Sequence, residues 1–160
     1  MFEIGDKILY PLYGAGFIED ITEREFSGRL VKYYILRLVF GRMEPSVPVE
    51  TSEALGLRHI ISPDRLADVS ARLSLPPEKE EPNWNKRYKL NMDRLRTGDI
   101  LQVCDIFRTL YARNARKALS TGEMKVLTQS RQILFSELML VSGMNEDETS
   151  DFVRNAMNTN

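Results

Sequence analysis

Residues 31–40 read VKYYILRLVF, a run rich in β-branched and aromatic side chains. Such runs are typical of strands that pack on a hydrophobic core. Three further runs of this kind surround it: KILY at 7–10, GFIEDIT at 16–22 and RMEPSVPV at 42–49. Gly14 and Gly16 separate the first two, and Ser27-Gly28 marks a hairpin turn, where glycine takes a positive φ without steric cost. We therefore predict a small, strongly bent antiparallel sheet of four or five strands, with a barrel-like form.

The pattern changes after Gly56. Ser62 followed by Pro63 is typical of a helix start, and predicts a helix of roughly 11 residues through RLADVSARL. Residues 76–82 then read PPEKEEP, which is incompatible with a continuing helix and indicates an extended connector. The predicted helix is free to pack with either side of the chain.

Beyond Pro82 the chain has helical periodicity. Asn83 and Asp99 are N-cap residues for two helices, and the second carries apolar side chains three and four residues apart. Ser120 with Glu123, and Asn145 with Glu148, have the spacing of a capping box and open two more helices. Four helices with short connections predict a small antiparallel bundle. The fold class is therefore α+β, a β module followed by an all-helical domain.

Composition excludes several classes of protein. The chain has 160 residues, 42% hydrophobic and 28% charged, which is typical of a soluble globular protein with one ordinary domain or two small ones. No apolar run approaches the roughly 20 residues that cross a bilayer, and the first residues have no export signal, so we expect a cytoplasmic protein without membrane contact. One cysteine and one histidine form neither a disulfide nor a four-ligand zinc site.

The net charge of −1 is unevenly distributed. Residues 1–81 hold 10 basic against 14 acidic side chains, residues 82–131 hold 11 against 4, and residues 132–160 hold 1 against 5. The middle segment therefore has a net charge of +7. This asymmetry indicates binding to a polyanion such as nucleic acid, although a basic segment is also compatible with a merely solvated helix face.

Catalysis has little support in the sequence. Cys104 falls on an apolar helix stripe and His59 follows GLR without an evident partner, so we expect both to be structural. Phosphate-loop, dinucleotide, zinc-protease and serine-hydrolase motifs are missing. We expect a binding protein, with no cofactor, metal or small-molecule ligand.

The segment PNWNKRYK, residues 82–89, combines chemistry suited to DNA. It places the single tryptophan, Trp84, at a helix start beside Lys86, Arg87 and Lys89. Helix N-termini favour phosphate, and a flat apolar ring can wedge against or between bases. The alternative is that Trp84 fills a gap in the bundle or between the modules, because tryptophan is usually well buried.

Several stretches together resemble the CarD/CdnL family of bacterial transcription regulators. Three motifs carry most of the resemblance: YPxxGxG at 10–16, GLR at 56–58 and WxxRYK at 84–89. The longer matching stretches are GDKILYPLYGAGFIEDI, VPVE, SEALGLRHIIS, NWNKRYKLNMDRLRTGD and LSTGEMKVLTQSRQILFSEL, which cover most of the chain.

The resemblance implies both a fold and a mechanism. It implies a Tudor-like N-terminal module, shared with the transcription-repair coupling factor, that docks on the β subunit lobe of bacterial RNA polymerase. It also implies a helical domain on promoter DNA, with a tryptophan in the minor groove at the upstream edge of the transcription bubble, which makes open complexes persist.

We predict two sets of binding residues on this basis. The DNA-binding set is Trp84, Lys86, Arg87, Lys89 and Lys125. The polymerase-binding set is Arg24, Arg42, Ser46, Val47 and Pro48. Several relatives carry a basic residue where this chain has Ser46, so the resemblance implies the binding mode but not the exact polymerase contacts. Prolines near this segment fit an edge strand, which adds to a partner's sheet through main-chain hydrogen bonds.

The sequence thus predicts three segments: a polymerase-binding β module at 1–55, a helix and proline-rich connector at 56–81, and a helical DNA-binding domain at 82–160. The alternative is a protein-only adaptor, in which the β module docks on a partner and the helical bundle is structural or binds a second protein.

Overall fold

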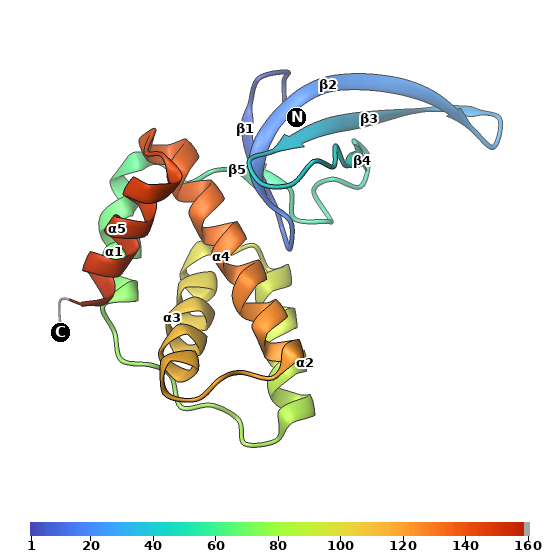
Figure 1. The fold of residues 1–160 in the computed structure, drawn as a ribbon. Coiled ribbons are helices and arrows are strands. Elements are labelled where there is room, and N and C mark those ends of the chain that lie inside the picture. Colours follow the sequence, from blue (N-terminus) through green and yellow to red (C-terminus); the bar gives the residue numbers. More distant parts are fainter. Residues whose placement is uncertain (159–160) are drawn as a thin grey trace.

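The computed structural model describes residues 1–158, a β module followed by helices (Figure 1). The strands are β1 (Lys7–Tyr10), β2 (Gly14–Phe26), β3 (Arg29–Leu38), β4 (Ser46–Pro48) and β5 (Arg58–His59). A 3₁₀ turn at Pro63–Arg65 leads into α1 (Leu66–Leu73), followed by α2 (Trp84–Arg96), α3 (Ile100–Arg116), α4 (Thr121–Ser142) and α5 (Glu146–Met157). The α+β class and the order of the two parts are confirmed.

The strands form one antiparallel sheet in the order β4-β3-β2-β1-β5, so β4 and β5 are its edges. The β2–β3 hairpin extends well beyond the other strands as a curved arm (Figure 1). Ser27 and Gly28 form its turn with φ of 51° and 79°, as the sequence predicted for the glycine. β2 is longer than predicted because its polar end, Glu23–Phe26, pairs with β3 although it is exposed.

Side chains cap four helices as the sequence predicted. Asn83, Asp99, Ser120 and Asn145 each accept a hydrogen bond from a backbone N–H of the first turn. Asn145 and Glu148 form the complete capping box. Ser62 precedes the 3₁₀ turn without a side-chain cap bond, so α1 begins later, at Leu66.

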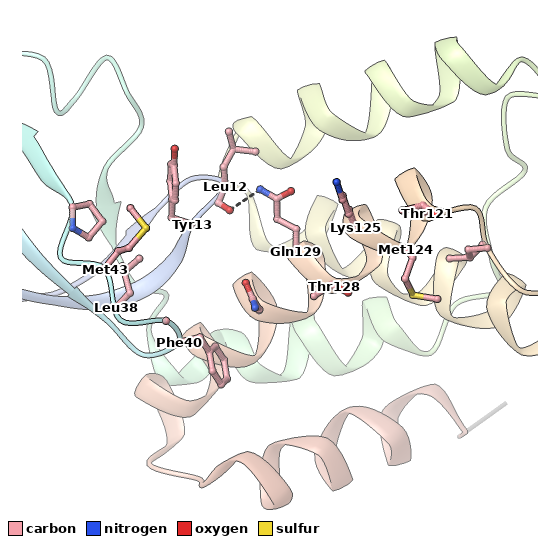
Figure 2. A pocket seen from close by; sticks show the side chains of 14 residues that line it. Leu12, Tyr13, Leu38, Phe40, Met43, Thr121, Met124, Lys125, Thr128 and Gln129 are labelled. Atoms are coloured by element: carbon pink, nitrogen blue, oxygen red, sulfur yellow. Dashed lines mark hydrogen bonds between the residues drawn. The ribbon is translucent and has the colours of Figure 1, made fainter.

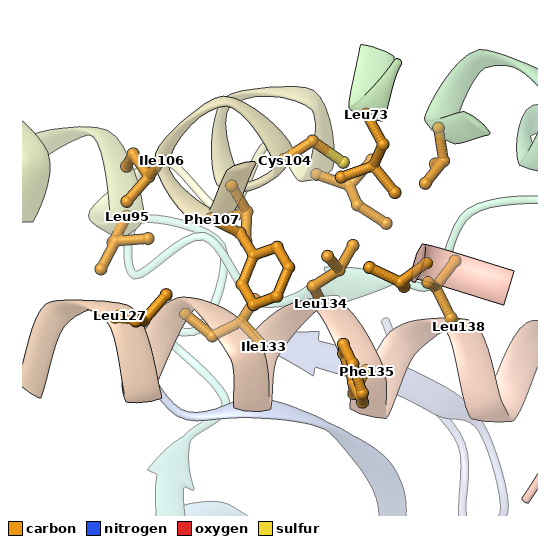
Figure 3. Packing of buried hydrophobic residues seen from close by; sticks show 14 of the residues in the cluster. Leu73, Leu95, Cys104, Ile106, Phe107, Leu127, Ile133, Leu134, Phe135 and Leu138 are labelled. Atoms are coloured by element: carbon orange, nitrogen blue, oxygen red, sulfur yellow. The ribbon is translucent and has the colours of Figure 1, made fainter. Parts of the chain in front are cut away.

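Two hydrophobic cores meet at β1. Successive strand side chains point to opposite faces, so Ile8 enters the core of the sheet while Leu9 enters the core of the helices. The helical core is formed chiefly by α3 and α4, with Phe107 and Leu134 near its centre (Figure 3). One strand therefore serves both cores and joins the β module directly to the bundle.

The structure assigns residues 56–81 to the two modules differently from the sequence prediction. β5 lies beyond residue 55, the predicted end of the β module, and pairs with β1. α1 packs against α3 and α5, so it is part of the helical domain. The proline-rich connector after α1 therefore links two helices of one domain and does not separate the modules.

Candidate polymerase and nucleic-acid interfaces

The joint between the β module and the helices centres on Arg58 of the GLR motif. Its guanidinium donates two hydrogen bonds to the Glu137 carboxylate, at 2.7 and 2.8 Å, and two to the Gly98 carbonyl, at 3.1 and 2.7 Å. Glu137, on α4, is 0% exposed and also accepts from the Ile61 N–H at 2.8 Å. One residue of β5 thus links the sheet to α4 and to the turn between α2 and α3.

The YPxxGxG motif forms the other half of this joint. A Cβ on Gly14, where φ is +114°, would lie 3.0 Å from Ser136 Oγ of α4. The same hydroxyl accepts from the Ala15 N–H at 2.8 Å. Pro11 packs where a Cβ on Gly98 would lie only 2.9 Å from its Cγ. The motif therefore allows close approach between the sheet and the helices, which holds the two modules in one orientation.

Trp84 lies at the end of the bundle where α2 and α4 begin and α3 ends (Figure 1). Its side chain remains 46% exposed, stacked on Tyr88 at a centroid distance of 5.8 Å and an interplanar angle of 14°. Its Cζ2 atom also lies close to Gly122, where an added Cβ would be 3.2 Å away. The indole is accordingly a half-exposed surface ring and does not plug the bundle.

Most of the basic residues in 82–131 are engaged within the protein. Arg87 is bound by Glu123, Arg94 by Glu78 and Asp105, and Arg108 by Asp105. Within residues 1–158, four cations of this segment form no ion pair, and all are exposed: Lys86, Arg116, Lys117 and Lys125. The net charge of +7 therefore overestimates the unpaired positive charge that this segment presents at the surface.

The five predicted DNA-binding residues have different surroundings. Lys86 and Lys125 are exposed without ion pairs, and Lys89 is exposed beside Asp93 at 3.7 Å. Arg87 differs, because its side chain is only 11% exposed and its guanidinium is held by Glu123, which leaves it poorly placed to bind a phosphate. Arg116 and Lys117 are not in the predicted set, although the short connection of residues 117–120 places them near the start of α4.

Two buried carboxylates organise the charged interior of the helical domain. Burial raises the pKa of Asp105, but hydrogen bonds from Arg72 and Arg108 outweigh it and hold the pKa below its ordinary value. Hydrogen bonding from Arg87 lowers the pKa of Glu123 against the effect of burial. Both carboxylates therefore favour the folded state more when they are ionised.

This predicts acid lability. A carboxylate whose pKa is lower in the folded protein than in the unfolded chain stabilises the fold. This stabilisation is fully present above the ordinary pKa values, 3.8 for Asp105 and 4.5 for Glu123. It is lost as the pH falls through the lowered pKa values of the folded protein. The melting temperature should fall as the pH drops below about 4, and less steeply in Asp105→Asn than in the wild type. Thermal melts from pH 7 to pH 2.5 test this, and parallel curves for the two proteins would exclude a contribution from Asp105.

The outer face of the sheet brings together most of the predicted polymerase-binding residues. The Arg24 guanidinium lies 5.4 Å from the centre of the Tyr33 ring, and Tyr33 pairs with Pro48 across β3 and β4. Ser46 lies two residues from Pro48 and is on the same face of β4. Arg42 is exposed on the preceding loop.

Val47 is the exception in this set. It is 0% exposed and belongs to the core of the sheet with Tyr34 and Leu36. The reason is strand alternation, which turns Val47 inward when its neighbours face outward. The structure therefore does not bring the Val47 side chain together with the other predicted polymerase-binding residues on the outer face of the sheet.

A groove of about 660 Å³ lies between the β module and α4 (Figure 2). Its walls are mostly apolar, with Phe40 and Met43 from the segment after β3 and Met124 from α4. Lys125 and Gln129 also line it, and Gln129 Nε2 donates to the Leu12 carbonyl at 2.8 Å. Among the residues described, no carboxylate, histidine or cysteine lines it.

Cys104 and His59 have structural surroundings. Cys104 is buried in the helical core, and burial raises the pKa of its thiol. His59 does have a partner, contrary to expectation: it lies on β5 with its ring 4.8 Å from that of Phe2. Among the described residues, no group of three metal-ligating side chains occurs, and no helix has the length and apolarity needed to cross a membrane.

Comparison with known proteins agrees with both parts of the structure. Residues 2–61 match the CarD-like/TRCF RID domain, and residues 68–154 match the CarD C-terminal domain. A Bacillus subtilis (strain 168) protein named "Putative transcription factor YdeB" is 34% identical over 161 residues, covering 95% of this chain and 99% of that protein. The two matched regions meet at the joint described above, and the resemblance found in the three sequence motifs is confirmed. The chain belongs to the CarD/CdnL family of transcription regulators, which interact with RNA polymerase.

Proposed function

We propose that this protein binds the β subunit of RNA polymerase through its sheet and stabilises the open promoter complex by placing Trp84 at the upstream edge of the bubble. The observation that carries the proposal is the half-exposed indole at the start of α2, in a helical domain joined firmly to the sheet. The protein acts by binding, and the mostly apolar walls of the groove between the β module and α4 support that.

The polymerase contact is proposed for the outer face and the β4 edge. Leu36 N–H donates to the Pro45 carbonyl and Val49 N–H to the Lys32 carbonyl, which sets the hydrogen-bonding alternation of β4. In this alternation the N–H and C=O of Ser46 point away from β3. They are available to a strand of a partner sheet, and Arg24 adds a charged contact on the adjoining face.

The DNA contact is proposed to be weak and largely independent of sequence. Among the residues described, only a few cations around Trp84 face solvent, and the sequence of residues 82–131 has no repeated pattern of side chains that would read major-groove edges. Weak contact suffices, because a domain joined to polymerase-bound protein acts on promoter DNA at high effective concentration. An indole at the edge of the bubble meets bases whose unstacking is already partly complete.

Charge reversal at Arg24 tests the assigned face of the sheet. Arg24→Glu should weaken binding to the β subunit by about 1–3 kcal/mol, roughly five- to a hundred-fold, because a favourable charge is replaced by a repulsive one. Lys32→Glu is the matched control, since Lys32 is an exposed cation of the same hairpin on the opposite face. Binding is measured by titration with isolated β subunit. Equal affinities for the two variants would show that another face docks.

A further inference from the structure

We propose that the first turn of α4 is the positioning device for Trp84. In this proposal Glu123 fixes the start of α2 through Arg87. Gly122, which has no side chain, leaves room for the indole beside the α4 backbone. The inference rests on the proposed function, because it assigns residues that hold the wedge and do not themselves touch DNA.

Glu123 and Arg87 form a nearly buried, two-point ion pair. Arg87 Nε lies 3.0 Å from Glu123 Oε2 and Nη2 lies 2.8 Å from Oε1, with side-chain exposures of 11% and 4%. The remaining nitrogen of Arg87, Nη1, donates to the carbonyls of Glu81, at 2.9 Å, and Pro82, at 3.4 Å. One guanidinium therefore ties α4 to the backbone just before Trp84, from a position three residues after it.

A second arginine completes the arrangement. Arg113 of α3 donates to both oxygens of the same carboxylate, at 2.8 and 3.1 Å, and to Glu80 at 2.8 Å. Glu123 of α4 thus binds one arginine from α2 and one from α3, and these two arginines also bind the connector. Paired charges that are nearly excluded from water keep a defined geometry, because losing one partner leaves the other charge uncompensated.

The carboxylate of Glu123 is diverted from its own helix to make these contacts. The sequence predicted a capping box, in which Ser120 and Glu123 satisfy each other's backbone N–H groups. Ser120 does accept from the Glu123 N–H, at 3.3 Å, but the Glu123 carboxylate binds Arg87 and Arg113. The first turn of α4 therefore has only one of the two hydrogen bonds of a capping box, because the Glu123 carboxylate binds the start of α2 through Arg87.

Gly122 supplies an independent second contact. A Cβ placed on Gly122 would lie 3.2 Å from Cζ2 of Trp84, closer than ordinary van der Waals contact. The edge of the indole therefore lies directly over the α4 backbone, while Tyr88 stacks on the ring. A Cβ at 122 would therefore require the ring to shift by a few tenths of an ångström, although alanine is otherwise the better residue in a helix.

The test uses the full chain and exploits Trp84 as the only tryptophan, so that intrinsic fluorescence of the free protein reports on this ring alone. Glu123→Gln should lower the fluorescence anisotropy, shift the emission and shorten the open-complex lifetime at least three-fold, with the helical circular dichroism retained at 25 °C. Asp105→Asn is the matched control, because Asp105 is a buried carboxylate that holds the other end of α2 through Arg94 at 3.2 Å. It should lower the melting temperature but leave emission and lifetime unchanged.

Gly122→Ala keeps the inference testable if Glu123→Gln does not fold. It should shift the Trp84 emission and shorten the lifetime without lowering the melting temperature. In a Trp84→Ala background, Glu123→Gln should have no additional effect on lifetime. The inference is overturned if folded Glu123→Gln and Gly122→Ala keep wild-type emission, or if Asp105→Asn changes it equally. If Trp84→Ala itself leaves the lifetime unchanged, the proposed function fails, and the fluorescence comparison still decides the positioning.

Discussion

Trp84→Ala should shorten the lifetime of the open promoter complex by roughly five- to a hundred-fold while leaving the fold intact. An aromatic stacking contact with a base contributes about 1–3 kcal/mol, and about 1.4 kcal/mol corresponds to a ten-fold change in a rate or equilibrium constant. The fold should tolerate the change because the indole is half exposed and lies against Tyr88 and the Gly122 backbone. The lifetime is measured on a reconstituted polymerase–promoter complex challenged with competitor DNA.

Tyr111→Ala is the matched control for this variant. Tyr111 is 47% exposed, close to the value for Trp84, and stacks on an aromatic neighbour, Phe107, at 5.6 Å. It faces the α5 side of the bundle, where it lines a cavity with Met157. Loss of this ring should therefore leave the lifetime unchanged. If Trp84→Ala unfolds the helical domain by circular dichroism, the ring has a structural role and the wedge proposal fails.

Arg58→Met should produce the largest loss of stability, about 3–5 kcal/mol, or roughly 6–20 °C in melting temperature. The substitution leaves Glu137 without its cation at a position that is 0% exposed. Glu137→Gln should cost less, because Arg58 is 29% exposed and keeps its bonds to the Gly98 and His59 carbonyls. Thermal and urea unfolding give both values.

The control for Arg58 is Arg29→Met, which breaks the exposed ion pair between Arg29 and Glu50. Exposed pairs contribute about 0–1 kcal/mol, so this variant should melt close to the wild type. The double variant Arg58→Met/Glu137→Leu should recover much of the lost stability, since it also removes the buried carboxylate that Arg58→Met leaves without a cation. If Arg58→Met is no less stable than Arg29→Met, the joint does not depend on this pair.

Local features of the fold could be predicted because the residues that determine them are neighbours in sequence. The hairpin turn at Ser27-Gly28 and the caps at Asn83, Asp99 and Asn145 depend on one to four residues each. The exposure of Trp84 could also be predicted from its place at the start of a helix, because few helical residues precede it that could cover the ring.

Long-range ion pairs could not be predicted in this way. Arg87 looked like a phosphate contact because its partner, Glu123, is 36 residues away and had an adequate local role as a capping residue. The motif residues Arg58 and Gly14 have their partners on α4, more than 70 residues away. The inward position of Val47, by contrast, was available from strand alternation, because its neighbours Ser46 and Pro48 face outward.

Site-specific crosslinking from position 84 tests the central claim most directly. A photoreactive phenylalanine analogue replaces Trp84 in the full chain, and its crosslinks are mapped along promoter DNA in complexes with polymerase. We expect crosslinks at the upstream junction of paired and unpaired bases, present in open complexes and lost when Arg24→Glu is combined with the analogue. Crosslinks distributed along the duplex, or equal in open and closed complexes, would contradict the placement of Trp84 at the bubble edge.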